Sequence, residues 1–289
     1  MELTRKTAEG LEQRIFTYNS SMNENDMIVN IYPVDNIEAL FEEDNRRFSE
    51  HIQIPHWREL VLAFPYDDPF VDPTGLELDT VTSYHVQAIR KANLKGITPV
   101  TILGILNTSD NKLVYGIRGG QVGAGQANAV PGGHVTPSIK YSTNPIFSSF
   151  YDELICETGL MPNEVSKAVL IGHQTDPKHK SLCFVMDATT PHESGELYEI
   201  HRKAFEVYTQ ALKSGKPELE ARKAIADAGL PNIDAWENRE LVFLQNESDY
   251  IQKIIELGEI EHKGHRYQTF DNSIGALIIY KTLREQGTI

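Results

Sequence analysis

The stretch Pro131–Leu160 constrains the fold of this 289-residue chain more than any other. It holds a Pro-Gly-Gly-His loop, a polar linker, and a segment that ends Asp-Glu-Leu-Ile-Cys-Glu-Thr-Gly-Leu. In that segment, helical geometry places Glu153 and Glu157 one turn apart on one face, with Cys156 on the same arc. The other face carries apolar side chains at spacings of three and four, which predicts a helix packed against a core. Two carboxylates beside a glycine turn make a candidate site for a divalent cation.

Charge and cysteine content exclude several classes of function. The formal net charge of -14 argues against nucleic acid and against an anionic membrane surface as partners. The two cysteines, Cys156 and Cys183, cannot build a disulfide framework, and no zinc-binding Cys/His spacing is present. The N-terminus lacks the apolar core of a signal peptide, and no apolar run reaches membrane-spanning length. We therefore expect a cytoplasmic protein that binds neither nucleic acid nor membrane.

Strand and helix patterns mix along the chain without strict alternation. This mixture predicts an α/β (α+β) fold in which a mixed sheet is sandwiched between helices. The strands Thr98–Leu106 and Leu113–Arg118 flank a polar turn and predict a hairpin. Asn144 is a good helix N-cap, and Pro145 suits the first helical position. The other predicted strands are Met27–Val34, Val165–Gln174, Ser181–Thr189 and Arg239–Gln245, and the other predicted helices are Asn36–Phe48, His201–Lys213, Pro217–Ala228, Glu247–Leu257 and Asn272–Leu283, with Leu78–Asn93 expected to be a loop that leads into a helix.

Turn-forming residues suggest where the chain divides. Residues 1–26 are polar and sparse in apolar side chains, and the best boundary signal is the turn-rich Pro65–Gly75. We divide the chain into an N-terminal region, residues 1–95, packed on or part of the same domain, and a main domain, residues 96–289. Two helices at residues 201–229 interrupt the strand series, so we interpret them as an insertion.

A glycine-rich loop, Gly119–Gly125, precedes the central stretch. It loosely resembles the phosphate-binding loop of dinucleotide-binding proteins. In such proteins a helix follows the glycines, whereas Pro131 follows them here. A dehydrogenase is therefore a poor interpretation, and a flexible loop accounts better for the glycines.

The central stretch resembles the Nudix superfamily, whose sequence box is G-x5-E-x7-R-E-U-x-E-E-x-G-U, with U a bulky apolar residue. Gly133 matches the opening glycine, Glu153-Leu154 the E-U step, Glu157 the second of the paired glutamates, and Gly159-Leu160 the end. The preceding hairpin and Arg118 also stand where the family places them. The resemblance implies a Nudix-like mixed sheet between helices, with an N-terminal extension and a helical-pair insertion.

Several positions depart from the box. Asp152 stands where the family has arginine, and Cys156 stands where it has the first paired glutamate. The loop is about five residues longer than the pattern, and the position of the upstream glutamate falls on Asn144 when the helix sets the register. These departures leave the box two carboxylates short.

A group of short segments is similar to the atypical, degenerate-box Nudix branch that includes the mammalian UDP-glucose pyrophosphatase. The segments are Val81–Tyr84, Val130–His134, Phe147–Ser149, Glu237 with Glu240–Leu244, and Gly275–Tyr280. This resemblance implies hydrolysis of a UDP-sugar to UMP and a sugar 1-phosphate. The implied cofactor is Mg²⁺, with Mn²⁺ as an alternative, and the implied partner is a nucleoside diphosphate small molecule. A homodimer is left open.

The expected chemistry assigns roles to individual residues. Glu153 and Glu157 are expected to be catalytic and to bind the metal, because Mg²⁺ prefers carboxylate oxygens. Glu237, just before a strand, is the candidate third carboxylate or general base, and the weaker alternatives are Glu240, Glu196 and Glu199. The expected substrate-binding residues are Arg118, Gly132, Gly133 and Tyr84.

Each of these residues also has a structural interpretation. A glutamate pair spaced by four is often a solvated helix face, and a strand-end arginine such as Arg118 is often solvated. Tyr84 suits a core, Glu237 a surface loop, and His134 a structural hydrogen bond. Cys156 is a poor Mg²⁺ ligand because a thiolate is soft. The missing carboxylates favour the alternative function, a catalytically impaired Nudix-fold module that binds a nucleotide or a protein.

Overall fold

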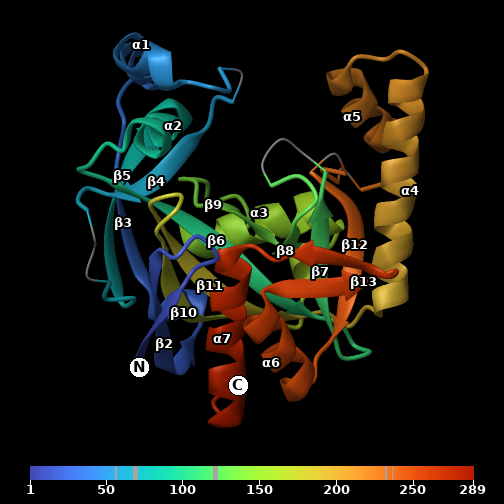
Figure 1. Ribbon diagram of the computed structural model, residues 1–289. Coiled ribbons are helices and arrows are strands. Elements are labelled where there is room, and N and C mark those ends of the chain that lie inside the picture. The colour runs from blue at the N-terminus through green and yellow to red at the C-terminus, as the bar shows by residue number, and fades with distance from the viewer. Residues whose placement is uncertain (56, 68–70, 120–122, 232, 236) are drawn as a thin grey trace.

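The computed structural model describes residues 1–55, 57–67, 71–119, 123–231, 233–235 and 237–289. In these residues a 12-stranded mixed sheet runs in the order β1-β2-β10-β11-β6-β4-β5-β3, with β7, β8, β9 and β12 branching from it (Figure 1). A separate two-stranded sheet pairs β13 with β14. The strands are β1 (Glu2–Lys6), β2 (Glu12–Met22), β3 (Ile28–Tyr32), β4 (Leu60–Phe64), β5 (Gly75–Thr82), β6 (Thr98–Asn107), β7 (Lys112–Arg118), β8 (Ala127–Ala129), β9 (Gly132–His134), β10 (Lys167–Asp176), β11 (Ser181–Thr189), β12 (Asn238–Gln245), β13 (Glu259–His262) and β14 (His265–Gln268).

Helices cover both faces of the sheet, as the sequence predicts for its fold class. They are α1 (Ile37–Phe48), α2 (Ser83–Ala92), α3 (Pro145–Thr158), α4 (Ser194–Lys213), α5 (Glu218–Asp227), α6 (Ser248–Leu257) and α7 (Asp271–Glu285). Alternate side chains of β10 and β11 pack on opposite faces of the sheet, because successive strand residues point to opposite sides. Leu170 and Phe184 pack in the same cluster as Phe150 of α3, whereas Ile171 and Val185 pack in the cluster that contains α7.

Strand β6 lies at the centre of the sheet and brings α3 close to it. It pairs with β11 in parallel and with β9 in antiparallel orientation. A Cβ atom at Gly104 of β6 would lie 2.8 Å from the Phe150 ring and 2.7 Å from Pro131. Only glycine fits there, so this residue sets how closely α3 and the loop before β9 approach the sheet.

The ends of α3 are set by local signals. The Asn144 side chain accepts a hydrogen bond from the N–H of Ile146 at 3.0 Å, and Pro145 is the first helical residue. The predicted start of the helix is therefore confirmed. Gly159 ends the helix in a left-handed conformation with φ of 80°, and its N–H donates to the carbonyl of Ile155 at 2.9 Å.

The N-terminal residues differ from expectation. Residues 1–26, which look unpatterned, form β1 and β2, and β2 pairs with β10 through Ile15 and Gln174. The face of β2 that is buried includes Gln13 and Thr17, so its pattern does not look amphipathic. Residues 78–82, the first part of the segment expected to be a loop that leads into a helix, belong to β5, and the helix begins at Ser83.

Two further expectations are corrected. The strands β6 and β7 are antiparallel but pair only at Asn107 and Leu113, and β7 instead pairs along its length with β12. The expected hairpin is therefore short, because β7 leaves β6 to extend the sheet. Helix α4 begins at Ser194 rather than His201. In the glycine-rich loop, residues 120–122 lie outside the described residues, and the strand β8 follows Gly125 where a dinucleotide-binding fold needs a helix.

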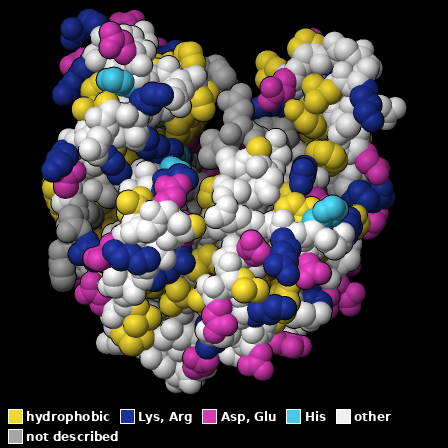
Figure 2. All heavy atoms as spheres, in the orientation of Figure 1, with side chains coloured by type: hydrophobic (Ala, Val, Ile, Leu, Met, Phe, Trp, Pro, Cys, Tyr) yellow, Lys and Arg dark blue, Asp and Glu magenta, His cyan; other side chains and the backbone are white. Residues whose placement is uncertain are grey.

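Two groups of helices stand on either side of α3 and β9. Figure 1 shows α1 and α2 on one side, over β3–β5, and α4 and α5 on the other. The space-filling surface is hollowed between these two lobes (Figure 2). None of the helices in the described parts of the chain has the length and apolar character needed to cross a bilayer.

Candidate active site

Glu157 of α3 is buried and held by three donors. It is 1% exposed. The N–H of Gly132 in β9 donates to its Oε2 at 2.7 Å, and Nδ2 of Asn238 donates to its Oε1 at 2.9 Å. Nη1 of Arg118 lies 3.7 Å from the same Oε1. Burial, followed by the charge of Glu237, raises the pKa of Glu157 to about 8 against the opposing effect of the three donors.

Glu153, one turn earlier, has no such support. It is half-buried, and no hydrogen bond or ion pair joins its carboxylate to another described residue. A Cβ atom at Gly133 would lie 1.8 Å from its Oε1, so the carboxylate rests against the glycine backbone. Burial, followed by the charges of Glu157 and Glu237, raises its pKa well above the usual range. Glu153 is thus a carboxylate without a counter-charge among the described residues.

Arg118, at the end of β7, joins Glu157 to Glu237. Its Nη2 lies 2.5 Å from Oε1 of Glu237, and the Arg118 side chain is 12% exposed. The N–H of Gly119 donates to the backbone carbonyl of Glu237 at 2.8 Å, which fixes that residue at the start of β12. The structure therefore brings together Glu153, Glu157, Glu237, Arg118 and the Gly132-Gly133 turn, five features that the sequence indicates.

Two more acids lie near this group, and the sequence analysis missed both. The N–H of Asp234 donates to the carbonyl of Cys156 in α3 at 2.5 Å. Burial, together with the charge of Glu237, raises the pKa of Asp234 to about 7. Glu59 accepts a hydrogen bond from Trp57 at 3.3 Å, and burial raises its pKa. The sequence did contain one signal for Asp234. It stands between the apolar residues Ile233 and Ala235, and an acid in an apolar segment is often partly buried.

Cys156 lines this group as a neutral thiol. It is half-buried, and burial followed by the charges of Asp234 and Glu153 raises its pKa. A neutral thiol is a weak ligand for a hard cation, so Cys156 does not replace the missing glutamate.

The donor set suits a cation that needs few protein ligands. Among the described residues, no three His, Cys, Asp or Glu side chains are arranged to hold a metal ion between them. Mg²⁺ often binds through one or two carboxylates and keeps several waters or takes substrate phosphate oxygens. The unpaired Glu153, with Glu157 a turn away, fits this type of site.

The other residues singled out from the sequence have different neighbours. Tyr84 is buried, donates to the carbonyl of Pro55 and packs edge-on against Phe41 at 5.2 Å, so no described contact joins it to Glu153. His134 lies next to Gly133, with Nε2 3.3 Å from Nη2 of Arg90. The alternative acids are in surface ion pairs: Glu240 with Lys263, Glu196 with His192, and Glu199 with Arg202.

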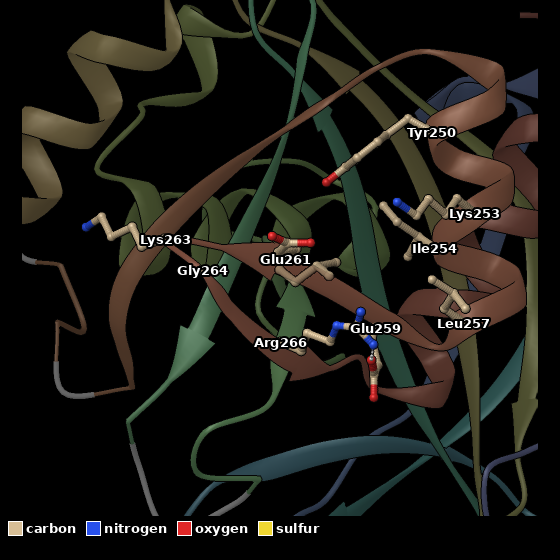
Figure 3. A pocket seen from close by; sticks show the side chains of 10 residues that line it. Tyr250, Lys253, Ile254, Leu257, Glu259, Glu261, Lys263, Gly264 and Arg266 are labelled. Carbon is tan, nitrogen blue, oxygen red and sulfur yellow. Dashed lines mark ion pairs between the residues drawn. The ribbon is translucent and has the colours of Figure 1, made fainter.

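Other cavities lie away from α3. One of about 300 Å³ is formed by α6 and the β13–β14 hairpin, with Tyr250, Ile254 and Leu257 along one side (Figure 3). The charged residues in it include Glu259 and Arg266, which form an ion pair at 3.8 Å. None of its described lining residues belongs to the carboxylate group, so this cavity does not contribute to the candidate site.

Comparisons with known proteins give only distant likenesses. No protein-family model matches the chain, and no curated protein matches it by sequence. Solved structures similar to it include DR0079 from Deinococcus radiodurans, at 11% identity and a TM-score of 0.33, over 55% of this chain and 73% of that one. Another is Tm1382, described as a candidate Nudix hydrolase, at 8% identity and a TM-score of 0.34, over 78% of this chain and 100% of that one.

Proposed function

We propose that the chain hydrolyses the pyrophosphate bond of a nucleoside diphosphate linked to another group, with Mg²⁺ or Mn²⁺ as cofactor. A UDP-sugar is the first substrate to test, with UMP and a sugar 1-phosphate as products. The observation that carries the proposal is Glu153, a half-buried carboxylate without a described protein partner that rests against Gly133, one turn from Glu157. A carboxylate in that setting is stabilised by a bound cation.

The chain's own residues divide the work of such a reaction. Glu153 and Glu157 would hold Mg²⁺, which would supply charge neutralisation at the phosphates and a lower pKa for a bound water. Arg118 offers a guanidinium to the diphosphate from beside Glu157. The N–H of Gly132 holds Glu157, and Gly133 leaves room for the Glu153 carboxylate beside the backbone.

Glu237 is proposed as the general base or as a third carboxylate. Its contact with Arg118 uses Oε1, which leaves Oε2 to accept the proton of the attacking water. The water oxygen then bonds to one phosphorus atom while the bridging oxygen leaves with the other phosphate. Arg118 holds Glu237 in place and would turn toward the substrate as the diphosphate enters.

The test is release of UMP from a UDP-sugar with Mg²⁺, measured by chromatography for the wild type and for Glu153→Gln. We expect product only with the metal, and a loss on the order of 100-fold in Glu153→Gln, since a charge that stabilises the transition state is removed. Glu199→Gln is the matched control, because it removes one glutamate charge from an exposed helix face. Equal turnover in Glu153→Gln and wild type would reject the assignment.

A second candidate function is nucleotide binding without hydrolysis. The observation that favours it is that Gly132, Asn238 and Arg118 already contact the two carboxylate oxygens of Glu157. Such contacts are typical of a residue that stabilises the fold rather than one that binds a metal. A UDP-sugar that raises the melting temperature, with no product after long incubation with Mg²⁺ or Mn²⁺, would support this binding function over hydrolysis.

A further inference from the structure

A second cavity, of about 280 Å³, lies between the C-terminal end of α2 and the turn that joins β10 to β11. Its described lining residues do not include any residue of α3, β9 or β12. Part of its wall is apolar, and two lysines with two acids supply its charges. The apolar and cationic side chains of the wall include Ile89, Leu94, Ile97, Leu182, Lys95 and Lys180. This cavity is therefore separate from the carboxylate group.

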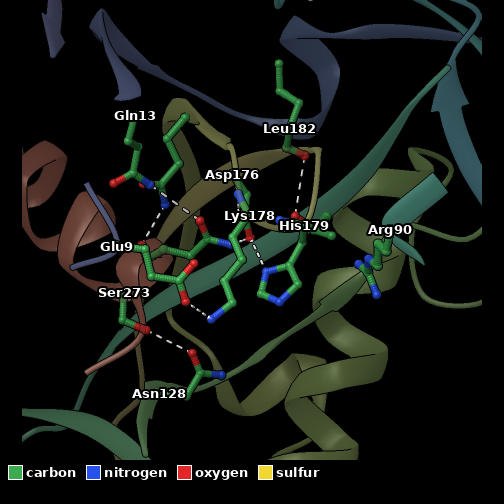
Figure 4. Close-up of polar contacts among 12 residues, drawn as sticks. Glu9, Gln13, Arg90, Asn128, Asp176, Lys178, His179, Leu182 and Ser273 are labelled. Carbon is green, nitrogen blue, oxygen red and sulfur yellow. Dashed lines mark hydrogen bonds and ion pairs between the residues drawn. The ribbon is translucent and has the colours of Figure 1, made fainter. Parts of the chain in front are cut away.

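The acids at this cavity are already occupied. Oδ1 of Asp176 accepts the backbone N–H groups of Lys178 and His179 at 3.1 and 2.9 Å. Its Oδ2 contacts Nδ1 of His179 and Nδ2 of Asn272, each at 2.7 Å (Figure 4). Asp67 accepts a backbone N–H at 3.1 Å. Asp176 is thus committed to shaping the turn and does not neutralise a lysine.

The donors at this cavity are not occupied. Nζ of Lys180 and Oγ of Ser181 are both shielded from water and have no hydrogen-bond partner among the described residues. Ser181 is 3% exposed. No ion pair within the described parts of the chain involves Lys95 or Lys180. Burying an ammonium and a hydroxyl without hydrogen-bond partners destabilises the folded protein. An anion that accepts hydrogen bonds from both groups would offset this cost.

The backbone does not explain why a lysine stands at position 180. Its φ is 53°, in the left-handed region that glycine adopts without strain. A lysine there places a long cationic side chain along the cavity wall at a small conformational cost. Lys180 and the adjacent Ser181 both line the cavity.

We propose that this cavity binds a small organic anion. Lys180 and Ser181 hold its carboxylate or phosphate group, and Lys95 adds a second positive charge. The apolar side chains of Ile89 and Leu182 cover the rest of the ligand. The volume suits a ligand of about fragment size, near the lower end for small-molecule sites. Because hydrogen bonds already engage the two acids of the wall, the two lysines are the charges left to meet an anion.

The experiment uses the full chain without added metal and titrates it with 4-bromobenzoate, phenylphosphonate, inorganic phosphate and neutral benzamide. Binding is followed by calorimetry and by the melting temperature. We expect the two organic anions to bind and to bind about tenfold more weakly to Lys180→Met, because a charge-assisted hydrogen bond is lost. Lys178→Met is the matched control, since Lys178 is an exposed lysine of the same turn that pairs with Glu9.

Each outcome decides the proposal. Equal affinity in Lys180→Met and wild type overturns it, as does benzamide binding as tightly as 4-bromobenzoate. Inorganic phosphate that binds as tightly as phenylphosphonate overturns the role of the apolar wall. If Lys180→Met does not fold, Lys180→Gly replaces it, because glycine suits the observed φ. In a crystal soaked with 4-bromobenzoate, bromine in the cavity beside Leu182 supports the proposal, and bromine elsewhere contradicts it.

Discussion

The carboxylate of Glu153 occupies the space that a side chain would take at Gly133. A Cβ atom there would lie 1.8 Å from Oε1 of Glu153 and 2.3 Å from its Cδ. The atoms in conflict all belong to the end of a flexible side chain, so an added methyl group displaces the carboxylate and leaves the backbone in place. This relationship ties Gly133 of β9 to a half-buried acid of α3 that has no hydrogen bond or ion pair with another described residue.

Gly133→Ala is therefore expected to reduce hydrolysis at least tenfold, while the free energy of unfolding changes by about 1 kcal/mol or less. Activity assays and denaturant unfolding measure the two quantities. The double variant with Glu153→Ala provides the control. If Gly133→Ala acts through Glu153, it has no further effect once that carboxylate is gone. An additive loss in the double variant would mean that the methyl group acts elsewhere.

Glu153→Gln is expected to stabilise the metal-free protein at pH 7 by about 1 kcal/mol, although it slows hydrolysis. The physical reason is that Glu153 is half-buried, lies near other acids and has no described donor, so removing its charge relieves a cost. Urea unfolding without metal gives the stability. A variant that is less stable than the wild type would show that the Glu153 carboxylate has a partner in the folded protein.

Glu157→Gln is expected to destabilise the protein by about 1–3 kcal/mol, opposite in sign to the change at Glu153. The two oxygens of Glu157 accept from the Gly132 N–H and from Nδ2 of Asn238. A glutamine has one oxygen and one NH₂ group, so in either orientation one of those donors meets another donor. Unfolding of the variant measures the cost. Its control is Glu199→Gln, which makes the same substitution on an exposed helix face. An unchanged stability in Glu157→Gln would argue that water replaces the lost bond.

How far the sequence predicted this molecule depended on whether the signal was local. The start of α3 was predictable because Asn144 and Pro145 act on their own helix. Strand β2 was not, because it buries Gln13, which bonds to Gln174 at 2.9 Å far along the chain. Such a buried polar side chain hides the alternation that identifies a strand.

The same distinction applies to the candidate site. Glu153 and Glu157 could be paired from helical spacing alone. The approach of Asp234 to Cys156 could not, because it depends on how the segment after α5 packs on α3. In that packing, Pro231 and Ile233 lie so close to Gly159 that a Cβ atom added there would be 3.1 Å from each of them. The functional roles of all the site residues named from the sequence stay predictions.

His201 of α4 gives a prediction for acid stability. It is 2% exposed, and burial lowers its pKa to about 4 from 6.5, against opposing effects of Asn238 and Glu240. Between these two values the unfolded chain binds a proton that the folded chain does not, so stability falls as pH drops from 6.5 to 4. The shift corresponds to roughly 3 kcal/mol.

His201→Gln is expected to make the free energy of unfolding less dependent on pH in this window, as measured by urea unfolding at several pH values. His173, whose pKa burial lowers to about 3, keeps part of the dependence in that variant. The same slope in His201→Gln and wild type would show that His201 takes up its proton in the folded state.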